Sequence, residues 1–189
     1  MPCVSRSGWS RRSTEMDATP LDCGLCVVRP WRVTDKPSLL RHANNRNVWR
    51  NLAHRFPHPY TDADADFWLG KLSREPGQLR WAIEVEGAAV GGIGAEPGEG
   101  IFAKTGNFGY WLGEEFWGRG IMTAAARTTS DYALTTMDLA RLESPVFEWN
   151  PASMRVLEKC GFEREGVRRK GIFKDGQIID AVIYARVKE

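Results

Sequence analysis

Residues 117–123 read Trp117-Gly118-Arg119-Gly120-Ile121-Met122-Thr123, and they lie between a predicted strand and a predicted helix. The two glycines allow backbone conformations that other residues avoid, and they let a ligand approach the main chain closely. The helix that follows points unpaired N–H groups and the positive end of its dipole at this stretch, and Arg119 adds a cation. The stretch therefore predicts a pyrophosphate-binding loop. The same pattern also occurs in simple tight turns, and it is neither a Walker loop nor a dinucleotide fingerprint.

Downstream of this loop, a strand predicted over 141–149 leads into Asn150-Pro151-Ala152-Ser153. Asn is a preferred N-cap and Pro is favoured at the first helical position, so a helix is predicted from 151, with Gly161 as its stop. Asn150 and Ser153 are then either ordinary parts of a helix N-terminus or polar groups that face a ligand beside the glycine loop. The chain ends in a predicted hairpin, 162–173 and 177–187, around an Asp175-Gly176 turn.

Upstream of the loop, strands and helices alternate. The predicted elements are a strand over 25–31, a helix over 35–45, an aromatic loop over 56–60, a helix over 61–74, hairpin strands over 80–86 and 88–94, and a strand over 107–112. This order predicts one mixed α/β (α+β) domain over 25–189, with a mostly antiparallel sheet of about seven strands, four or so helices and one parallel crossover.

Residues 1–24 differ from the rest because three arginines stand among small polar residues with no apolar periodicity. They contain no apolar stretch of the length that a secretory signal needs. We therefore expect a disordered N-terminal extension ahead of the domain.

The composition excludes several classes of protein. The chain has 189 residues, of which 42% are hydrophobic and 26% are charged, so it can bury a substantial core. No apolar run reaches the length of a membrane-spanning helix. A net charge of +2 disfavours a dedicated nucleic-acid-binding protein. Cys23 and Cys26 form a single C-x-x-C without a second pair, so reduced thiols in a cytoplasmic protein are expected rather than a metal site.

Taken together and in order, several short motifs resemble the GCN5-related N-acetyltransferase (GNAT) superfamily, and within it the RimJ/RimL-like branch of ribosomal-protein N-terminal acetyltransferases. The resemblance covers about residues 25–189. Besides the two motifs quoted above, the matching pieces are Leu25 to Trp31 with Thr34-Asp35, Phe56-Pro57-His58-Pro59-Tyr60-Thr61, Val90-Gly91-Gly92-Ile93-Gly94, Gly109-Tyr110-Trp111-Leu112-Gly113, Glu158-Lys159-Cys160-Gly161-Phe162, and Lys174-Asp175-Gly176 with Asp180 and Tyr184.

The resemblance implies a GNAT fold, acetyl-CoA as co-substrate and a primary amine as acceptor. The pantetheine arm is expected in a splay between the strands 108–112 and 141–149, held by Tyr110, Trp111 and Leu112. The pyrophosphate is expected on Trp117, Gly118, Arg119, Gly120, Ile121, Met122 and Thr123, and Asn150 is expected at the arm or at a bridging water. Phe56, His58 and Tyr60 are expected to line the acceptor cleft, with no metal involved.

Three positions depart from the family pattern. Met122 stands where a small residue is usual, Leu157 stands where many members have a tyrosine acid, and Asn107 stands where this branch often has glutamate. A protein α-amine, with a pKa of about 7.7–8.0, is already partly neutral near pH 7, whereas lysine, at about 10.4, needs a stronger base. The losses therefore favour an N-terminal acceptor. Glu148 is the candidate base and Ser153 the candidate donor to the thiolate, although both suit ordinary structural roles.

The predicted function is thus acetyl-CoA-dependent N-acetylation of a primary amine, most simply a protein N-terminus, by direct attack in a ternary complex. A polyamine, an aminoglycoside or an aminoacyl-tRNA remains open as acceptor, as does a non-catalytic acyl-CoA-binding module. A basic segment over 154–174 suits CoA phosphates, an acidic peptide or RNA, but it also suits a solvated face. Monomer and homodimer are both open.

Overall fold

The computed structural model describes residues 19–189. Its elements, with η for a 3₁₀ turn, are β1 Leu21–Asp22, β2 Val27–Pro30, η1 Val33–Asp35, α1 Lys36–Ala43, α2 Arg46–Trp49, α3 Asp62–Gly70, η2 Leu72–Arg74, β3 Leu79–Val85, β4 Ala88–Pro97, η3 Gly100–Phe102, β5 Thr105–Leu112, η4 Glu114–Phe116, α4 Ile121–Thr136, β6 Arg141–Phe147, α5 Pro151–Lys159, β7 Glu163–Lys174 and β8 Gln177–Val187. No helix in this part of the chain is long and apolar enough to cross a membrane.

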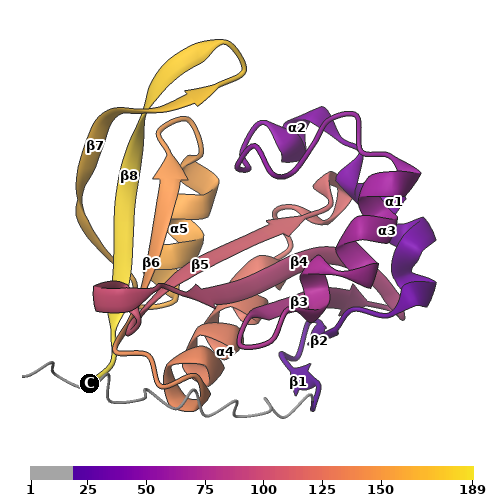
Figure 1. Cartoon of the computed structure of the whole chain (residues 1–189), viewed down its shortest axis with the longest axis horizontal. Helices are drawn as coiled ribbons and strands as arrows, with labels where there is room; N and C mark the ends of the chain where they lie inside the picture. Colours follow the sequence, from indigo (N-terminus) through magenta and orange to yellow (C-terminus); the bar gives the residue numbers. More distant parts are fainter. Residues whose placement is uncertain (1–18) are drawn as a thin grey trace, which may run out of the picture.

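A single sheet of 8 strands, ordered β1-β2-β3-β4-β5-β6-β8-β7, organises residues 19–189 (Figure 1). Only the β5–β6 pair is parallel, which confirms the predicted crossover. The strand beyond the expected seven is β1, where Leu21 and Asp22 pair with β2. The sheet therefore begins inside the segment predicted as an extension. The prediction of a disordered extension also covers residues 1–18, which lie outside the described residues.

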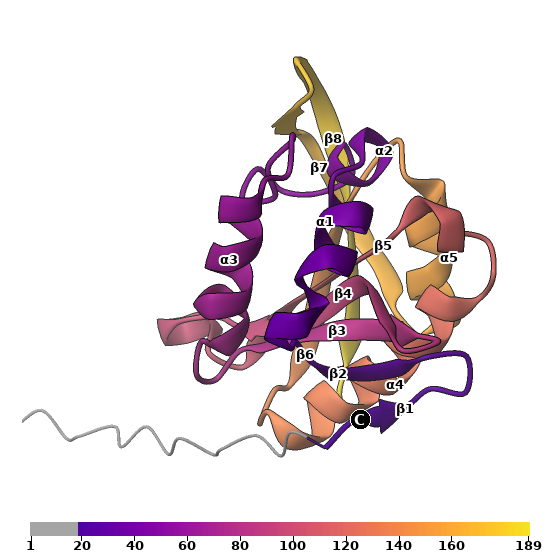
Figure 2. The same ribbon diagram turned by 90° about the vertical axis from the view of Figure 1, so that its right-hand side faces the viewer.

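Helices cover both faces of the sheet (Figures 1 and 2). On one face, α1 and α3 pack with sheet residues such as Trp31 and Ala82 into one apolar cluster. On the other face, α4 and α5 form a larger cluster with residues of the central strands. Strand β5 contributes to both clusters because its side chains alternate: Phe108 and Leu112 face α4 and α5, and Trp111 faces α1 and α3.

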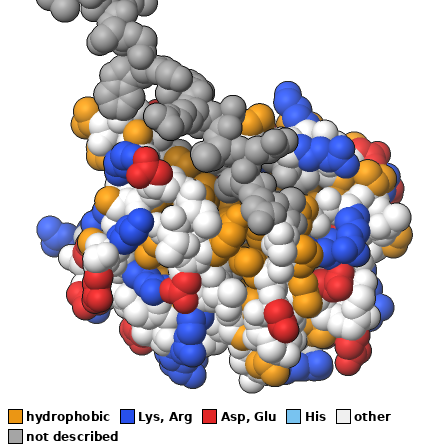
Figure 3. Space-filling model, turned by 90° about the horizontal axis from the view of Figure 1, so that it is seen from below, with side chains coloured by type: hydrophobic (Ala, Val, Ile, Leu, Met, Phe, Trp, Pro, Cys, Tyr) orange, Lys and Arg blue, Asp and Glu red, His pale blue; other side chains and the backbone are white. Residues whose placement is uncertain are grey.

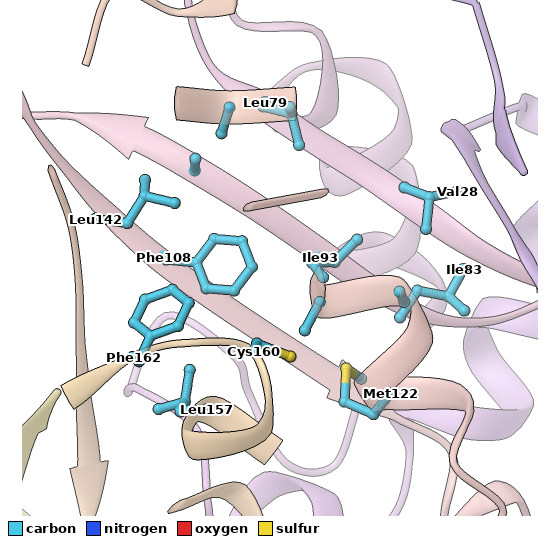
Figure 4. Packing of buried hydrophobic residues seen from close by; sticks show 14 of the residues in the cluster. Val28, Leu79, Ile83, Ile93, Phe108, Met122, Leu142, Leu157, Cys160 and Phe162 are labelled. Atoms are coloured by element: carbon cyan, nitrogen blue, oxygen red, sulfur yellow. The ribbon is translucent and has the colours of Figure 1, made fainter. Parts of the chain in front are cut away.

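The larger cluster is built from large side chains at close contact (Figure 4). Phe108 stacks on Phe162 with ring centres 5.4 Å apart. Leu157 is completely buried there, so the position at which the resemblance led us to look for a tyrosine acid is a core position in this protein. Met122 also belongs to this core (Figure 4).

Local signals place the helix ends. Asn150 accepts a hydrogen bond from the Ser153 N–H, and Pro151 follows it, as predicted. Thr61 and Asp64 form a capping box at the start of α3. Helix α3 ends at Gly70, earlier than predicted, because Leu72–Arg74 turn as a 3₁₀ segment. The four-residue α2, capped by Asn45, was not predicted.

The outer surface carries charges of both signs. Seen from the side opposite the tip of the β7–β8 hairpin, lysines and arginines alternate with aspartates and glutamates around apolar groups (Figure 3). Mixed charge of this kind gives no broad basic face in that view.

Candidate active site

Strands β5 and β6 separate in the middle of the sheet. Their parallel pairing is limited to Thr105–Asn107 against Arg141–Glu143, although β5 continues to Leu112 and β6 to Phe147. Beyond Asn107 the two strands border a gap, and this is the splay that the sequence predicted between them. The remaining neighbours stay paired, since β4 follows β5 from Gly106 to Leu112.

The gap is continuous with a cavity of about 790 Å³ that reaches both faces of the sheet. Its walls include Met122, Thr123 and Ser153 from α4 and α5 on one face. They also include Leu39 and Trp68 from α1 and α3 on the other. A cavity that passes through a sheet lets two molecules enter from opposite faces and meet between the strands.

The loop before α4 has the geometry of an anion site. Gly118 and Gly120 have φ of +75° and +79°, a region that favours glycine. Gly120 is the N-cap of α4 and offers no side-chain cap. The N–H groups of Ile121, Met122 and Thr123 have no acceptor within residues 19–189. All three residues line the cavity, so the dipole and free donors of a 16-residue helix are directed at it.

The predicted donor-binding residues are brought together, with one exception. Tyr110, Trp111, Leu112, Trp117, Gly118, Gly120, Ile121, Met122, Thr123, Asn150 and Ser153 all line the cavity. Arg119 does not; its guanidinium lies 5.4 Å from the centre of the Phe116 ring. The Trp117 indole donates to the Leu112 carbonyl at 2.7 Å, which ties the loop to the end of β5.

Tyr110 and Ser153 meet across the gap. The Tyr110 hydroxyl lies 2.9 Å from Ser153 Oγ and 3.2 Å from the Ser153 carbonyl oxygen. Burial raises the pKa of Tyr110, so its hydroxyl remains protonated at neutral pH. The sequence pointed to Ser153 but not to the Tyr110 hydroxyl. The alternation of β5, which sends Tyr110 to the same side as Phe108, is the signal that could have found it.

Glu148 lies outside the cavity. It is exposed, and its carboxylate accepts a hydrogen bond from the Asp180 N–H at 3.1 Å. The Glu148 N–H donates to the Asp180 carbonyl in return. The side chain therefore extends the pairing between the end of β6 and β8, which is the ordinary structural role that the sequence left open.

The predicted acceptor walls are brought together in part. Phe56 and Tyr60 line the cavity, with ring centres 5.1 Å apart. His58 is exposed and does not line it, because its ring lies against Trp49, 5.7 Å between centres. Trp68 lines the cavity but was missed, since nothing in its local pattern distinguishes it from an ordinary helix residue.

Only two carboxylates line the cavity among residues 19–189, Asp64 and Glu96, and both are engaged. Asp64 accepts from the Thr61 N–H and hydroxyl in the capping box of α3. Glu96 accepts from Arg55 at 2.8 Å and from Arg80 at 2.9 Å. Burial alone would raise the pKa of Glu96, but these two guanidiniums outweigh it and hold the pKa below its usual range. Glu96 is therefore a poor proton acceptor at neutral pH.

The basic segment 154–174 divides between cavity and surface. Arg155, Lys159 and Lys174 line the cavity. Lys174 is buried with its ammonium 3.7 Å from the centre of the Trp49 ring. The other basic residues of the segment lie outside the cavity lining. Arg155 and Lys159, on α5, are suitably charged for the phosphates of a bound nucleotide.

The C-x-x-C pair lies in the β1–β2 turn, with Cys26 buried below the start of α4. The Cys26 thiol is 3.9 Å from the Ile121 carbonyl oxygen. No group of three or more His, Cys, Asp or Glu side chains within residues 19–189 is placed to hold a metal ion.

Comparison with known proteins shows which protein family the sequence of this chain matches. Residues 26–163 match the family described as an acetyltransferase (GNAT) domain. Among curated proteins, the "Probable N-acetyltransferase YjcK" of Bacillus subtilis is 43% identical over 81 residues, 40% of this chain and 45% of that protein. The match thus spans less than half of that relative. The L-amino acid N-acetyltransferase AaaT of Escherichia coli is 27% identical over 86% of this chain and 98% of its own length.

Solved structures share the fold over most of the chain. RimJ of Mycobacterium smegmatis, in complex with CoA-disulfide, superposes with a TM-score of 0.77 and 26% identity, covering 89% of this chain and 86% of RimJ. A GNAT-family acetyltransferase from Bacillus anthracis has the same TM-score at 22% identity, covering 89% of this chain and 98% of its own, which shows the fold alone.

Proposed function

Because the chain belongs to the GNAT acetyltransferase family, we propose that it transfers an acetyl group from acetyl-CoA to the α-amino group of a protein or peptide N-terminus. Acetyl-CoA supplies the acetyl group as a thioester. The residues of this chain fit it: the N–H groups of 121–123 and the basic side chains of Arg155 and Lys159 suit its phosphates, and the gap beside Tyr110 suits its extended arm.

One observation carries the choice of acceptor: both carboxylates lining the cavity are already engaged, Asp64 by a helix cap and Glu96 by two arginines. Direct attack on a thioester requires a neutral amine. An α-amine, with a pKa of about 7.7–8.0, is partly neutral at physiological pH without a strong base, whereas lysine and other alkylamines, near 10.4, are not. Within residues 19–189, one lining carboxylate is held by two arginines and the other caps a helix, which favours an α-amine.

The charge of the cavity disfavours a polycationic acceptor. Five basic residues line it (Arg55, Arg80, Arg155, Lys159 and Lys174) against the two acidic ones. A polyamine or an aminoglycoside would find Glu96 already held by two arginines and not free to pair its second ammonium. A free amino acid is a second candidate acceptor, because the amino-acid acetyltransferase AaaT aligns over 98% of its length and an amino acid also presents an α-amine.

Tyr110 and Ser153 are the proposed proton source for the departing thiolate. Their hydroxyls share a hydrogen bond at the first turn of α5, where the helix N-terminus also favours a developing negative charge. A thiolate with a pKa near 8.5 leaves with little help, so positioning of the two reactants within the gap is the larger contribution.

The test is a thiol-release assay with acetyl-CoA and four acceptors: a peptide with a free N-terminus, the same peptide blocked at its N-terminus but carrying lysine, a free amino acid, and spermidine. We expect release with the free peptide, and mass spectrometry should locate the acetyl group on the α-amine. The rate should rise with pH through the pKa of the acceptor amine. Acetyl-CoA binding by calorimetry with no turnover on any acceptor would contradict catalysis and support a binding module.

A further inference from the structure

We propose that the aromatic pocket at the acceptor end of the cavity binds the side chain beside the reacting amine, so that acceptors with a large apolar or aromatic first residue are preferred. The aromatic pocket is defined by Phe56, Tyr60, Trp68 and Trp111, all of which line the cavity. The inference rests on the proposed transfer to an α-amine. It adds the class of side chain that the amine carries.

Three of the four rings of the aromatic pocket are joined by contacts through Phe56. Phe56 packs edge-on to Trp111 with centres 5.4 Å apart, and it lies 5.1 Å from Tyr60. Trp111 belongs to β5 immediately beside the gap through which the two reactants meet. A side chain held against these rings therefore lies beside the gap, where the α-amine of the same residue can enter it.

A fifth ring, that of Trp31, packs behind the aromatic pocket. Trp31 stacks on Trp111 at an interplanar angle of 13°, with centres 6.5 Å apart. It meets Trp68 edge-on, at 88° and 6.4 Å. Trp31 itself is buried and does not line the cavity. Trp111 and Trp68 both pack against the same buried ring. The pocket is therefore ordered before a ligand binds, and little conformational entropy is lost on binding.

Two polar groups of the aromatic pocket lack partners. Tyr60 is 6% exposed, and its hydroxyl, which keeps some accessible surface, makes no hydrogen bond within residues 19–189. The indole N–H of Trp68 is also buried without an acceptor in this part of the chain. The Trp68 N–H is covered, whereas the Tyr60 hydroxyl remains accessible and can donate to a ligand that brings an acceptor. The carbonyl group that follows an α-amine is such an acceptor.

The charges around the aromatic pocket are balanced among themselves. Arg55 and Arg80 both hold Glu96, and Arg80 also holds Glu75 at 2.7 Å. Two cations and two anions thus pair in one cluster. A charged side chain on the acceptor would find these groups already paired, whereas an apolar side chain gains burial against the rings.

The test compares wild-type protein on peptides that differ only at the first residue, with Phe, Leu, Ala, Ser, Lys and Asp, and on the matching amino-acid amides. Burying a large apolar side chain predicts kcat/KM higher by on the order of 10- to 100-fold for Phe and Leu than for Ala and Ser. Lys and Asp should be poorest. Equal or higher kcat/KM for Ala or Ser would overturn the inference and leave the proposed function standing.

Variants then locate the preference. Phe56→Ala should reduce the Phe-to-Ser ratio to within a few-fold of one while the KM for acetyl-CoA stays near the wild-type value. Phe102→Ala is the matched control, since Phe102 is exposed and does not line the cavity; it should retain the ratio. A retained ratio in Phe56→Ala would contradict this pocket. Transfer to apolar amides but to no peptide would support the pocket and refute a peptide acceptor, and no transfer to either set would refute both.

Discussion

At the scale of single residues, Gly120 shows how a backbone angle controls a binding site. Its φ of +79° allows the chain to enter α4 with the first N–H groups facing the cavity. A Cβ at this position would lie 3.5 Å from Leu25, which is ordinary contact. The constraint on Gly120 therefore comes from its backbone conformation and not from steric contact. A β-branched residue here would either hold a strained positive φ or change the conformation of the loop.

We expect Gly120→Val to weaken acetyl-CoA binding by at least about tenfold in calorimetry, because the strain of about 1–2 kcal/mol is relieved by moving the N–H groups. Gly87→Val is the matched control. Gly87 has φ of +82° in the β3–β4 turn, a Cβ there would have nothing within 4 Å, and the residue does not line the cavity. It should lose similar stability and retain affinity. Equal affinity in both variants would remove the loop from the site.

The Tyr110–Ser153 pair gives a second prediction at this scale. Ser153→Ala and Tyr110→Phe should each lower kcat by about tenfold, less than a usual general acid because a thiolate leaves readily. The affinity for acetyl-CoA should change little. If the two hydroxyls act together, the double variant should be hardly slower than either single variant. Additive losses would show that the hydroxyls act separately, and wild-type rates would make the pair structural.

At the scale of elements, a buried ion pair joins the sheet to the first helix. Arg29 of β2 is 1% exposed and makes two hydrogen bonds of 2.8 Å to Asp35, the N-cap of α1. Burial alone would raise the pKa of Asp35, but the hydrogen bonds and charge of Arg29 outweigh it and lower the pKa. The helix that forms one wall of the acceptor side is thus held by a charge that must remain ionised.

Asp35→Asn should lower the free energy of unfolding by about 3 kcal/mol at pH 7, since it leaves a buried guanidinium short of a partner. The native pKa of Asp35 is depressed, so its contribution is complete above the unfolded value of about 3.9 and disappears as the pH falls through the native value. Urea unfolding at pH 7, 5 and 3 should show the variant and the wild type converging only in acid. The exposed Glu163→Gln should match the wild type throughout, and a constant difference for Asp35→Asn would refute the linkage.

Elements with strong local signals were predictable from the sequence, and those that depend on distant contacts were not. Asn150-Pro151, Thr61 and Asp175-Gly176 each mark a boundary with their own chemistry, and the structure has a helix start or a turn at each. By contrast, β1 is two residues long and exists because β2 lies beside it. A strand of that length has no periodicity to detect.

The site divides in the same way. The glycine loop before α4, where we propose that the donor binds, could be predicted because a helix N-terminus and two glycines are contiguous in the chain. The aromatic pocket is assembled from three separate segments, the loop before α3, α3 itself and β5, and only the fold brings them together or turns His58 away onto Trp49. The sequence suggests Glu148 as a base only from its place at the end of a strand. Which way that side chain turns is decided by Asp180, 32 residues away.

At the scale of the whole molecule, the cavity is closed at one end by two segments far apart in sequence. Arg46 of α2 holds Asp175, in the turn of the β7–β8 hairpin, through two hydrogen bonds of 2.9 and 3.0 Å. Beside it, Lys174 lies over the ring of Trp49, and burial lowers the pKa of this lysine. Since Lys174 and Phe173 line the cavity, the contact between α2 and the hairpin forms part of its wall.

Arg46→Ala should therefore raise the KM for the acceptor by a few-fold and leave the KM for acetyl-CoA unchanged. The ion pair is exposed, so unfolding free energy should fall by less than about 1 kcal/mol. Lys104→Ala removes another exposed ion pair, to Asp138, away from the cavity lining, and should change neither constant. Identical steady-state constants in both variants would show that the hairpin contact does not shape the acceptor side.

The early separation of β5 from β6 also has a kinetic consequence that amide hydrogen exchange can measure. Past Asn107, the edge of β5 that faces β6 has no neighbouring strand within residues 19–189, so part of the centre of the sheet lacks the protection that central strands usually have. Amides of 109–112 and 144–147 that point into the gap should exchange with solvent deuterium faster than those of 105–107 and 141–143 in the free protein. Acetyl-CoA should slow the first group far more than the second. The middle of this sheet would then contain amides that exchange as the amides of an edge strand do.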